Sequence, residues 1–230
     1  MVTVLNGIKD QWIPRAEIKE IGDFLLTHPE YLYPLNNFVT QTRCVCHLHS
    51  KLELALKEAV SLDMVKGGDV TNQFATLSTQ FVKYDLANSG HARGDLLEYL
   101  CYSKGPFNRP QFGASEILRF RRCTIQNECG EALCGGNNVD VGFAHACEVI
   151  LELQECKYRL VNFLDESTRT KRKLDYMRCI QQRLGKGSIA GPVVFVTMQF
   201  DSRSEENTLK QMGYDFTVYS FEDVLSLIAC

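Results

Sequence analysis

Two carboxylates and a lysine lie close together in two short apolar segments in the second half of the chain. Asp140 stands in the first segment, and Glu155 and Lys157 stand at the end of the second. Paired carboxylates suit a divalent cation such as Mg²⁺, which is commonly held by one or two of them together with water and phosphate. A lysine beside such an ion can orient a water molecule or stabilise developing negative charge. These residue types therefore favour metal-assisted hydrolysis of a phosphate ester.

Strand pairing is expected to bring these three residues together. Segments 139–144 and 149–155 both have the composition of strands, and a hairpin between them places Asp140 directly opposite Glu155. Opposed residues of antiparallel strands have Cβ atoms about 4.5–5.5 Å apart. Lys157 lies on the same face as Glu155 because strand side chains alternate. The hairpin thus predicts two carboxylates and an ammonium group on one face.

The alternation along the second strand gives a further argument for a site. Glu155 and Lys157 continue an apolar row, whereas Glu152 and Gln154 lie on the more polar face. The apolar members of the row are Val149, Leu151 and Leu153. Charges at the end of a buried row are costly unless they are paired or bound to metal. The alternative to a metal site is a half-buried Glu155–Lys157 ion pair with a structural role.

These residues carry a resemblance to a known family. Asp140, followed by Glu155-Cys156-Lys157 on the next strand, resembles the active-site signature of the PD-(D/E)XK nuclease superfamily, which has the restriction-endonuclease-like fold. The order of elements from about Gly90 to the C-terminus also resembles that fold. The resemblance implies that Asp140 and Glu155 hold Mg²⁺, for which Mn²⁺ can substitute, and that Lys157 is the catalytic lysine. It also implies an acidic residue on the first core helix, where Glu98 stands.

A basic run follows the proposed strands and is a candidate for contact with nucleic-acid phosphates. Its members are Arg169, Lys171, Arg172 and Lys173. The alternative for such a run is the solvated start of a helix.

The elements that must position these residues form a mixed α/β pattern. Residues 1–88 are expected to be a helical N-terminal region, and residues 89–230 a nuclease-like core with a mixed central sheet flanked by helices. Apolar residues recur at helical spacing in 18–25 and in 171–184. The run 193–198 is almost continuously apolar, which is typical of a strand buried on both faces.

Composition sets limits on the class of protein. The 230 residues are 45% hydrophobic and carry a net charge of −3, which fits a globular chain with a sizeable core. A nucleic-acid surface must therefore be a local basic patch rather than an overall positive charge. The first residues do not form a secretion signal and no stretch is long and apolar enough to cross a membrane, so a cytoplasmic location is expected.

Ten cysteines are expected to be mostly reduced thiols that pack as small hydrophobic side chains. Two alternatives remain open. One is a zinc site in the segment Cys44–His49, which holds two cysteines and two histidines, and the other is a zinc site or a redox pair formed among Cys123, Cys129, Cys134 and Cys147.

The expected function is an Mg²⁺-dependent endonuclease that hydrolyses DNA, with a type II restriction endonuclease as the favoured role. The first third is expected to contribute substrate recognition or a homodimer contact. The alternatives are a nuclease that acts on RNA and a non-catalytic module that binds nucleic acid or protein.

Overall fold

The computed structural model describes residues 3–8, 14–65, 68–108, 117–127, 129–145, 150–165, 167–184 and 192–230. The chain divides into two compact units. A sheet unit comprises Met1–Trp12 and Cys101–Val224, and a helical unit comprises Ile13–Leu100 and Leu225–Cys230. This division falls after residue 100, whereas the sequence suggested a boundary after residue 88.

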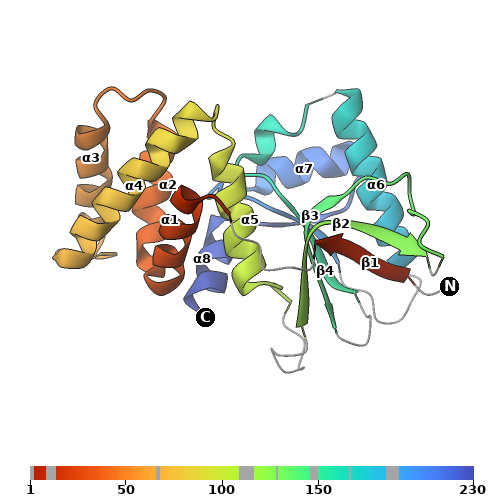
Figure 1. Ribbon diagram of the computed structural model, residues 1–230. Helices are drawn as coiled ribbons and strands as arrows, with labels where there is room; N and C mark the ends of the chain where they lie inside the picture. The colour runs from red at the N-terminus through yellow and green to blue at the C-terminus, as the bar shows by residue number, and fades with distance from the viewer. Residues whose placement is uncertain are drawn as a thin grey trace. The chain divides into compact units, whose positions relative to one another are not determined.

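The sheet unit contains a six-stranded mixed sheet among the described residues (Figure 1). Its strands lie in sequence order across the sheet: β1 Thr3–Ile8, β2 Ile117–Asn127, β3 Val139–His145, β4 Ile150–Cys156, β5 Val193–Val196 and β6 Thr217–Tyr219. The pairs from β1 to β4 are antiparallel, whereas β5 is parallel to β4 and β6 is parallel to β5. The expected α/β class with a mixed central sheet is confirmed.

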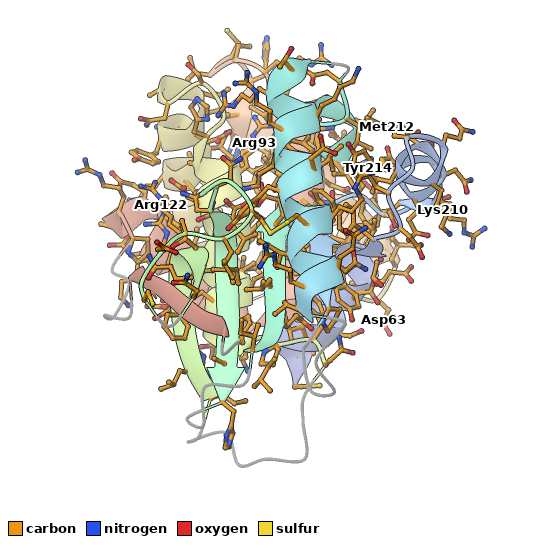
Figure 2. The ribbon with its side chains drawn as sticks, turned by 90° about the vertical axis from the view of Figure 1, so that its right-hand side faces the viewer. Asp63, Arg93, Arg122, Lys210, Met212 and Tyr214 are labelled. Carbon is orange, nitrogen blue, oxygen red and sulfur yellow. A yellow bond between two sulfur atoms is a disulfide. The ribbon has the colours of Figure 1, made fainter. Side chains whose placement is uncertain are left out.

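Helix α6, Thr168–Leu184, covers one face of this sheet (Figures 1 and 2). Its apolar positions recur every three or four residues, so that one stripe faces the strands. The stripe consists of Leu174, Met177, Ile180 and Leu184, all of them buried against the sheet. The four residues of β5 are also buried, as expected for a central strand. Helix α7, Arg203–Gln211, and the 3-10 helix η3, Leu160–Asn162, complete the connections of the unit.

The helical unit is built from a succession of helices in the first hundred residues. These are α1 Ala16–Thr27, η1 Pro29–Tyr31, α2 Leu32–Gln41, α3 Leu48–Ser61, α4 Asp69–Ala87 and most of α5 Ala92–Lys104. Helix α8, Phe221–Ala229, ends in the same unit. The predicted apolar stripe of α1 is buried, and the rings of Phe24, Tyr31 and Phe74 pack against one another within 6 Å. None of the described helices combines the length and apolarity needed to cross a bilayer.

The N-terminal strand β1 was not expected. It pairs antiparallel with β2, from Thr3 opposite Asn127 to Ile8 opposite Arg121. The assignment of residues 1–88 to a helical region was therefore wrong at this end. The reason is physical: a six-residue edge strand is stabilised by pairing with a partner more than a hundred residues away, and local periodicity does not report such pairing.

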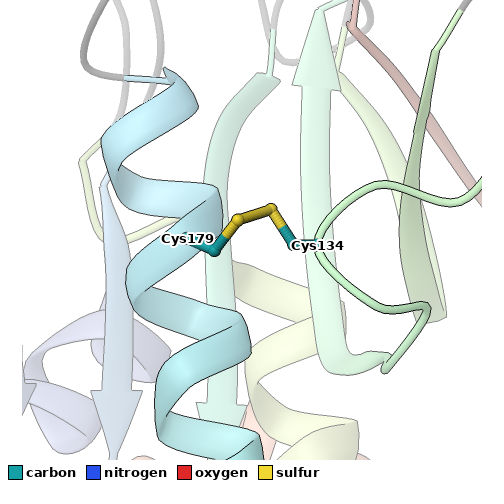
Figure 3. The surroundings of a disulfide bond; sticks show 2 residues. All are labelled: Cys134 and Cys179. Atoms are coloured by element: carbon teal, nitrogen blue, oxygen red, sulfur yellow. A yellow bond between two sulfur atoms is a disulfide. The ribbon is translucent and has the colours of Figure 1, made fainter.

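A disulfide joins Cys134, in the β2–β3 connection, to Cys179 in α6 (Figure 3). The expectation of mostly reduced cysteines is corrected for this pair, whose Cα atoms the fold brings to 5.8 Å of each other. Cys101, Cys123 and Cys156 are buried and form no disulfide, as expected.

The zinc alternatives find no support in the described residues, which contain no group of three or more histidine, cysteine or acidic side chains arranged to hold a metal ion. Cys44 and Cys46 carry free, exposed thiols. Cys134 forms a disulfide with Cys179, and Cys147 lies outside the described residues.

Candidate active site

The β3–β4 pairing brings Asp140 and Glu155 together. Val141 pairs with Gln154 and Gly142 pairs with Leu153, and the same register places Asp140 directly opposite Glu155, as predicted. The carboxylate of Asp140 also reaches the next residue of β4, because the backbone N–H of Cys156 donates to Oδ2 at 2.9 Å. This hydrogen bond fixes the Asp140 side chain at the end of the hairpin.

Lys157 lies between the two carboxylates. Its Nζ is 3.0 Å from Asp140 Oδ2 and 2.6 Å from Glu155 Oε1. It also donates to Cys156 O at 3.2 Å and lies 5.3 Å from the ring centroid of Phe163. Burial alone would lower the pKa of Lys157, but Glu155 and Asp140 together raise it above its ordinary value.

The backbone that carries Lys157 is held by the neighbouring strand. Although β4 ends at Cys156, the N–H of Lys157 donates to Val196 O at 2.8 Å and so extends the pairing with β5. The predicted grouping of Asp140, Glu155 and Lys157 is therefore fixed by backbone pairing on both sides of β4.

The apolar and polar side chains of β4 do not alternate as predicted. The register shifts between Phe143 and Ala144, which leaves Leu151 as an extra residue and breaks the expected row. The face that was expected to be polar is fully buried, since Glu152 and Gln154 have 0% exposure.

At the end of β4, Leu153 and Glu155 still share one face, as predicted. Leu153 belongs to the core under α6, and Glu155 also faces that helix. Burial on the opposite face is possible because the Glu152 carboxylate is well hydrogen-bonded. It accepts the backbone N–H groups of Phe107 and Asn108, each at 3.1 Å.

Glu155 is the most buried charged group of the site. It is 2% exposed and lies between two ammonium groups, with Lys157 at Oε1 and Lys173 of α6 2.7 Å from Oε2. Despite this proximity, Oε2 receives no hydrogen bond. Burial raises the pKa of Glu155, and the negative charge of Asp140 raises it further. The two lysines act in the opposite direction.

A cavity of about 880 Å³ opens above these residues. Its walls come from the end of the β2–β3 connection, the ends of β3 and β4, the η3 segment and the first turns of α6. The lining residues are Asn137, Asn138, Asp140, Glu155, Lys157, Asn162, Phe163, Asp165, Ser167, Thr168, Arg169, Thr170, Arg172 and Lys173.

The start of α6 is fixed by capping. Ser167 Oγ accepts the N–H of Thr170 at 3.2 Å, and Asp165 Oδ1 accepts hydrogen bonds from both hydroxyl groups at 2.6 Å. The hydrogen bonds from Ser167 and Thr170 lower the pKa of Asp165. Asp165 therefore serves the helix start, at the rim of the cavity.

The basic run divides between the cavity and its surroundings. Arg169, Arg172 and Lys173 line the cavity, whereas Lys171 is exposed on α6 and does not line it. Lys173 was expected at a phosphate surface, but its ammonium group contacts Glu155 inside the site. No sequence pattern indicates this contact, because it depends on how α6 packs over β4.

Glu98 is half-buried on α5 in the helical unit. The other predicted site residues lie in the sheet unit, where the structure brings together Asp140, Glu155 and Lys157. Its role as a further ligand stays a prediction.

The carboxylate pair fits a magnesium-type ion. Glu155 Oε2 is a buried oxygen with no hydrogen bond, and both described contacts of Asp140 use Oδ2. Mg²⁺ prefers oxygen ligands and usually keeps several waters, so two carboxylates at the floor of an open cavity are a suitable set. Asp140 and Glu155 would hold such an ion.

No protein-family model matches the chain, and no match is found among the curated proteins. Among solved structures, the chain is similar to protein VC1899 from Vibrio cholerae, with 11% sequence identity and a TM-score of 0.44. The similarity covers 95% of this chain and 56% of that chain, so this chain spans little more than half the length of VC1899. At this level of likeness, any functional argument must come from the site itself.

Proposed function

We propose that this protein is a divalent-metal-dependent nuclease that hydrolyses phosphodiester bonds in nucleic acid, with DNA as the favoured substrate. The observation that carries the proposal is the buried Glu155 carboxylate beside Asp140 and Lys157, at the floor of a cavity whose wall is basic. Acidic residues that meet a metal and basic residues that meet phosphate are both needed for this chemistry.

Each residue has a role that follows from its position. Asp140 and Glu155 would hold Mg²⁺ or Mn²⁺, which when bound polarises a phosphodiester and makes water a better nucleophile. Lys157 contacts both carboxylates and would orient the attacking water or stabilise the charge that develops on phosphate. Arg169 and Arg172 line the cavity wall, where they would contact the phosphates beside the scissile bond.

The biological setting belongs to the same proposal. A type II restriction endonuclease is the favoured role, with the helical unit as the source of substrate recognition or of a homodimer contact. Glu98 stays a candidate for a further acidic ligand, as the resemblance implies. A cytoplasmic location fits the buried free thiols, although the Cys134–Cys179 disulfide is more typical of an oxidising compartment.

Plasmid cleavage tests this function. We expect nicking or linearisation of DNA with Mg²⁺ or Mn²⁺ and no cleavage with EDTA. Asp140→Ala and Lys157→Ala should lower the rate by a factor on the order of 10² or more, since the first removes a metal ligand and the second removes the group that orients water or stabilises charge on phosphate. Equal cleavage by both variants and the wild type would assign the activity to another site or a contaminant.

A second candidate is a non-catalytic module that binds nucleic acid or protein. The balance of charge favours it, because the two carboxylates are already matched by Lys157 and Lys173 without a metal ion. Binding of DNA with no cleavage of DNA or RNA under Mg²⁺ or Mn²⁺ would support this candidate over the nuclease.

A further inference from the structure

Lys173 differs from the other basic residues of the first turns of α6. Its side chain is 14% exposed, whereas Arg169 and Arg172 are exposed. Its Nζ lies 2.7 Å from Glu155 Oε2 and donates a hydrogen bond to Asn138 O. Lys173 therefore links α6, the end of β4 and the segment that leads into Asp140.

The two ammonium groups at Glu155 are held in different ways. Lys157 has three oxygen acceptors, and the Phe163 ring lies beside it. Lys173 directs its hydrogen bond to Asn138 O instead, and Glu155 Oε2 accepts none. The contact of Lys173 with Oε2 is thus a charge contact without a directed hydrogen bond, so it is the easier of the two to replace.

We propose that Lys173 is an exchangeable counter-cation, which neutralises Glu155 in the metal-free protein and gives up Oε2 when a divalent cation binds. The inference rests on the proposed metal site. Like charges repel strongly at a few ångströms in a partly buried site, so a divalent cation at Glu155 disfavours an ammonium group against Oε2. Asn138 O keeps Lys173 attached to the cavity wall, in the cavity that Arg169 and Arg172 also line.

The consequence is that Lys173 weakens metal binding by competing for the same carboxylate. We expect Lys173→Met, which keeps the length and removes the charge, to bind Mn²⁺ about tenfold more tightly than the wild type. Lys173→Arg keeps the charge and should bind like the wild type. Lys210→Met, an exposed lysine of α7 outside the cavity, is the matched control and should change nothing. Free Mn²⁺ would be measured by electron paramagnetic resonance at fixed pH and without substrate.

A measurement on the unaltered protein covers the case in which Lys173→Met does not fold. Reductive methylation followed by mass spectrometry reports how accessible each lysine is. Lys173 should react slowly in EDTA and several-fold faster with Mn²⁺, whereas Lys210 should react equally in both conditions. Asp140→Asn should remove the acceleration at Lys173.

The outcomes separate this inference from the proposed function. Unchanged or weaker Mn²⁺ binding by Lys173→Met would overturn the counter-cation role, as would a rate of Lys173 methylation that is the same with and without Mn²⁺. Either result leaves an Asp140-dependent metal site intact. Absence of Mn²⁺ binding in the wild type and in every Lys173 variant overturns both proposals. Binding by Lys173→Met alone supports the inference in its strongest form.

Discussion

Glu155 is the residue on which the proposed metal site depends most. It is buried between Lys157 and Lys173, so its charge is compensated on both sides even without a metal ion. A buried ion pair is weak support for stability as such, because desolvation offsets much of the attraction. Removing one partner is different, since it leaves the other charges buried without compensation.

This difference gives a stability prediction for Glu155→Gln. We expect the free energy of unfolding in EDTA to fall by about 2–4 kcal/mol, since two ammonium groups lose their shared carboxylate. Urea unfolding followed by circular dichroism measures this loss. Glu222→Gln, an exposed position in the first turn of α8, should stay within about 0.5 kcal/mol of the wild type. A loss as small as the control's would mean that Glu155 is not paired as described.

Glu152 tests which face of β4 carries the metal. It is as buried as Glu155 but lies on the opposite face, where it binds the backbone of Phe107 and Asn108. We expect Glu152→Gln to lower the free energy of unfolding by about 2 kcal/mol, because hydrogen bonds to a charged acceptor are lost. Mn²⁺ affinity should be retained, and calorimetric titration would measure it. Loss of Mn²⁺ binding in Glu152→Gln together with its retention in Glu155→Gln would move the site to the other face.

At the scale of elements, the site depends on how α6 and the β2–β3 connection meet. Cys134, Gly135 and Gly136 all have positive φ, at 59°, 91° and 74°, a conformation that glycine adopts easily. This turn leads directly into Asn137 and Asn138 on the cavity wall. The Cys134–Cys179 disulfide ties the turn to α6, which also carries Lys173 (Figure 3).

Removal of this disulfide should therefore affect both stability and the site. We expect Cys179→Ser to lower the free energy of unfolding by about 4 kcal/mol, from the chain entropy of a closed loop with a sequence separation of 45 residues. Metal-dependent cleavage should also decrease, because the Asn138 segment is less firmly held. Thermal unfolding and plasmid cleavage measure the two effects, with Cys129→Ser, a free and exposed thiol nearby, as the control. Identical unfolding of both variants would show that the disulfide does not constrain the fold.

The elements that could be predicted from the sequence are those with strong local patterns. Helix α6 followed from apolar periodicity, strand β5 from a continuous apolar run, and the register of Asp140 opposite Glu155 from a short hairpin. Other features escaped prediction because they depend on contacts distant in sequence or on irregular backbone. They include the edge strand β1, the extra residue at Leu151, the Cys134–Cys179 disulfide and the contact of Lys173 with Glu155.

At the scale of the whole molecule, a net charge of −3 means that nucleic acid must be attracted locally. The basic wall of the cavity meets this need, since Arg169 and Arg172 line it together with Lys173. The affinity for DNA should fall as the salt concentration rises, because each phosphate contact releases a condensed counterion.

The basic cavity wall predicts how DNA binding depends on salt. We expect Arg172→Ala to weaken binding and to reduce the slope of log affinity against log salt by about 1, as for the loss of one phosphate contact. Fluorescence anisotropy with labelled duplex DNA in Ca²⁺ measures the slope. Lys210→Ala should leave it unchanged, and an equal effect of both substitutions would indicate non-specific attraction to the surface.

The proposed function requires that Asp140 and Glu155 bind one divalent cation. Anomalous diffraction from a crystal soaked in Mn²⁺ can show this ion, because manganese is identified by its own scattering. We expect a peak at about 2.0–2.2 Å from carboxylate oxygens of both residues, with water in the remaining positions. A well-diffracting soaked crystal with no peak between Asp140 and Glu155, with Lys157 still bound to both carboxylates and Lys173 still in contact with Glu155, would contradict this proposal.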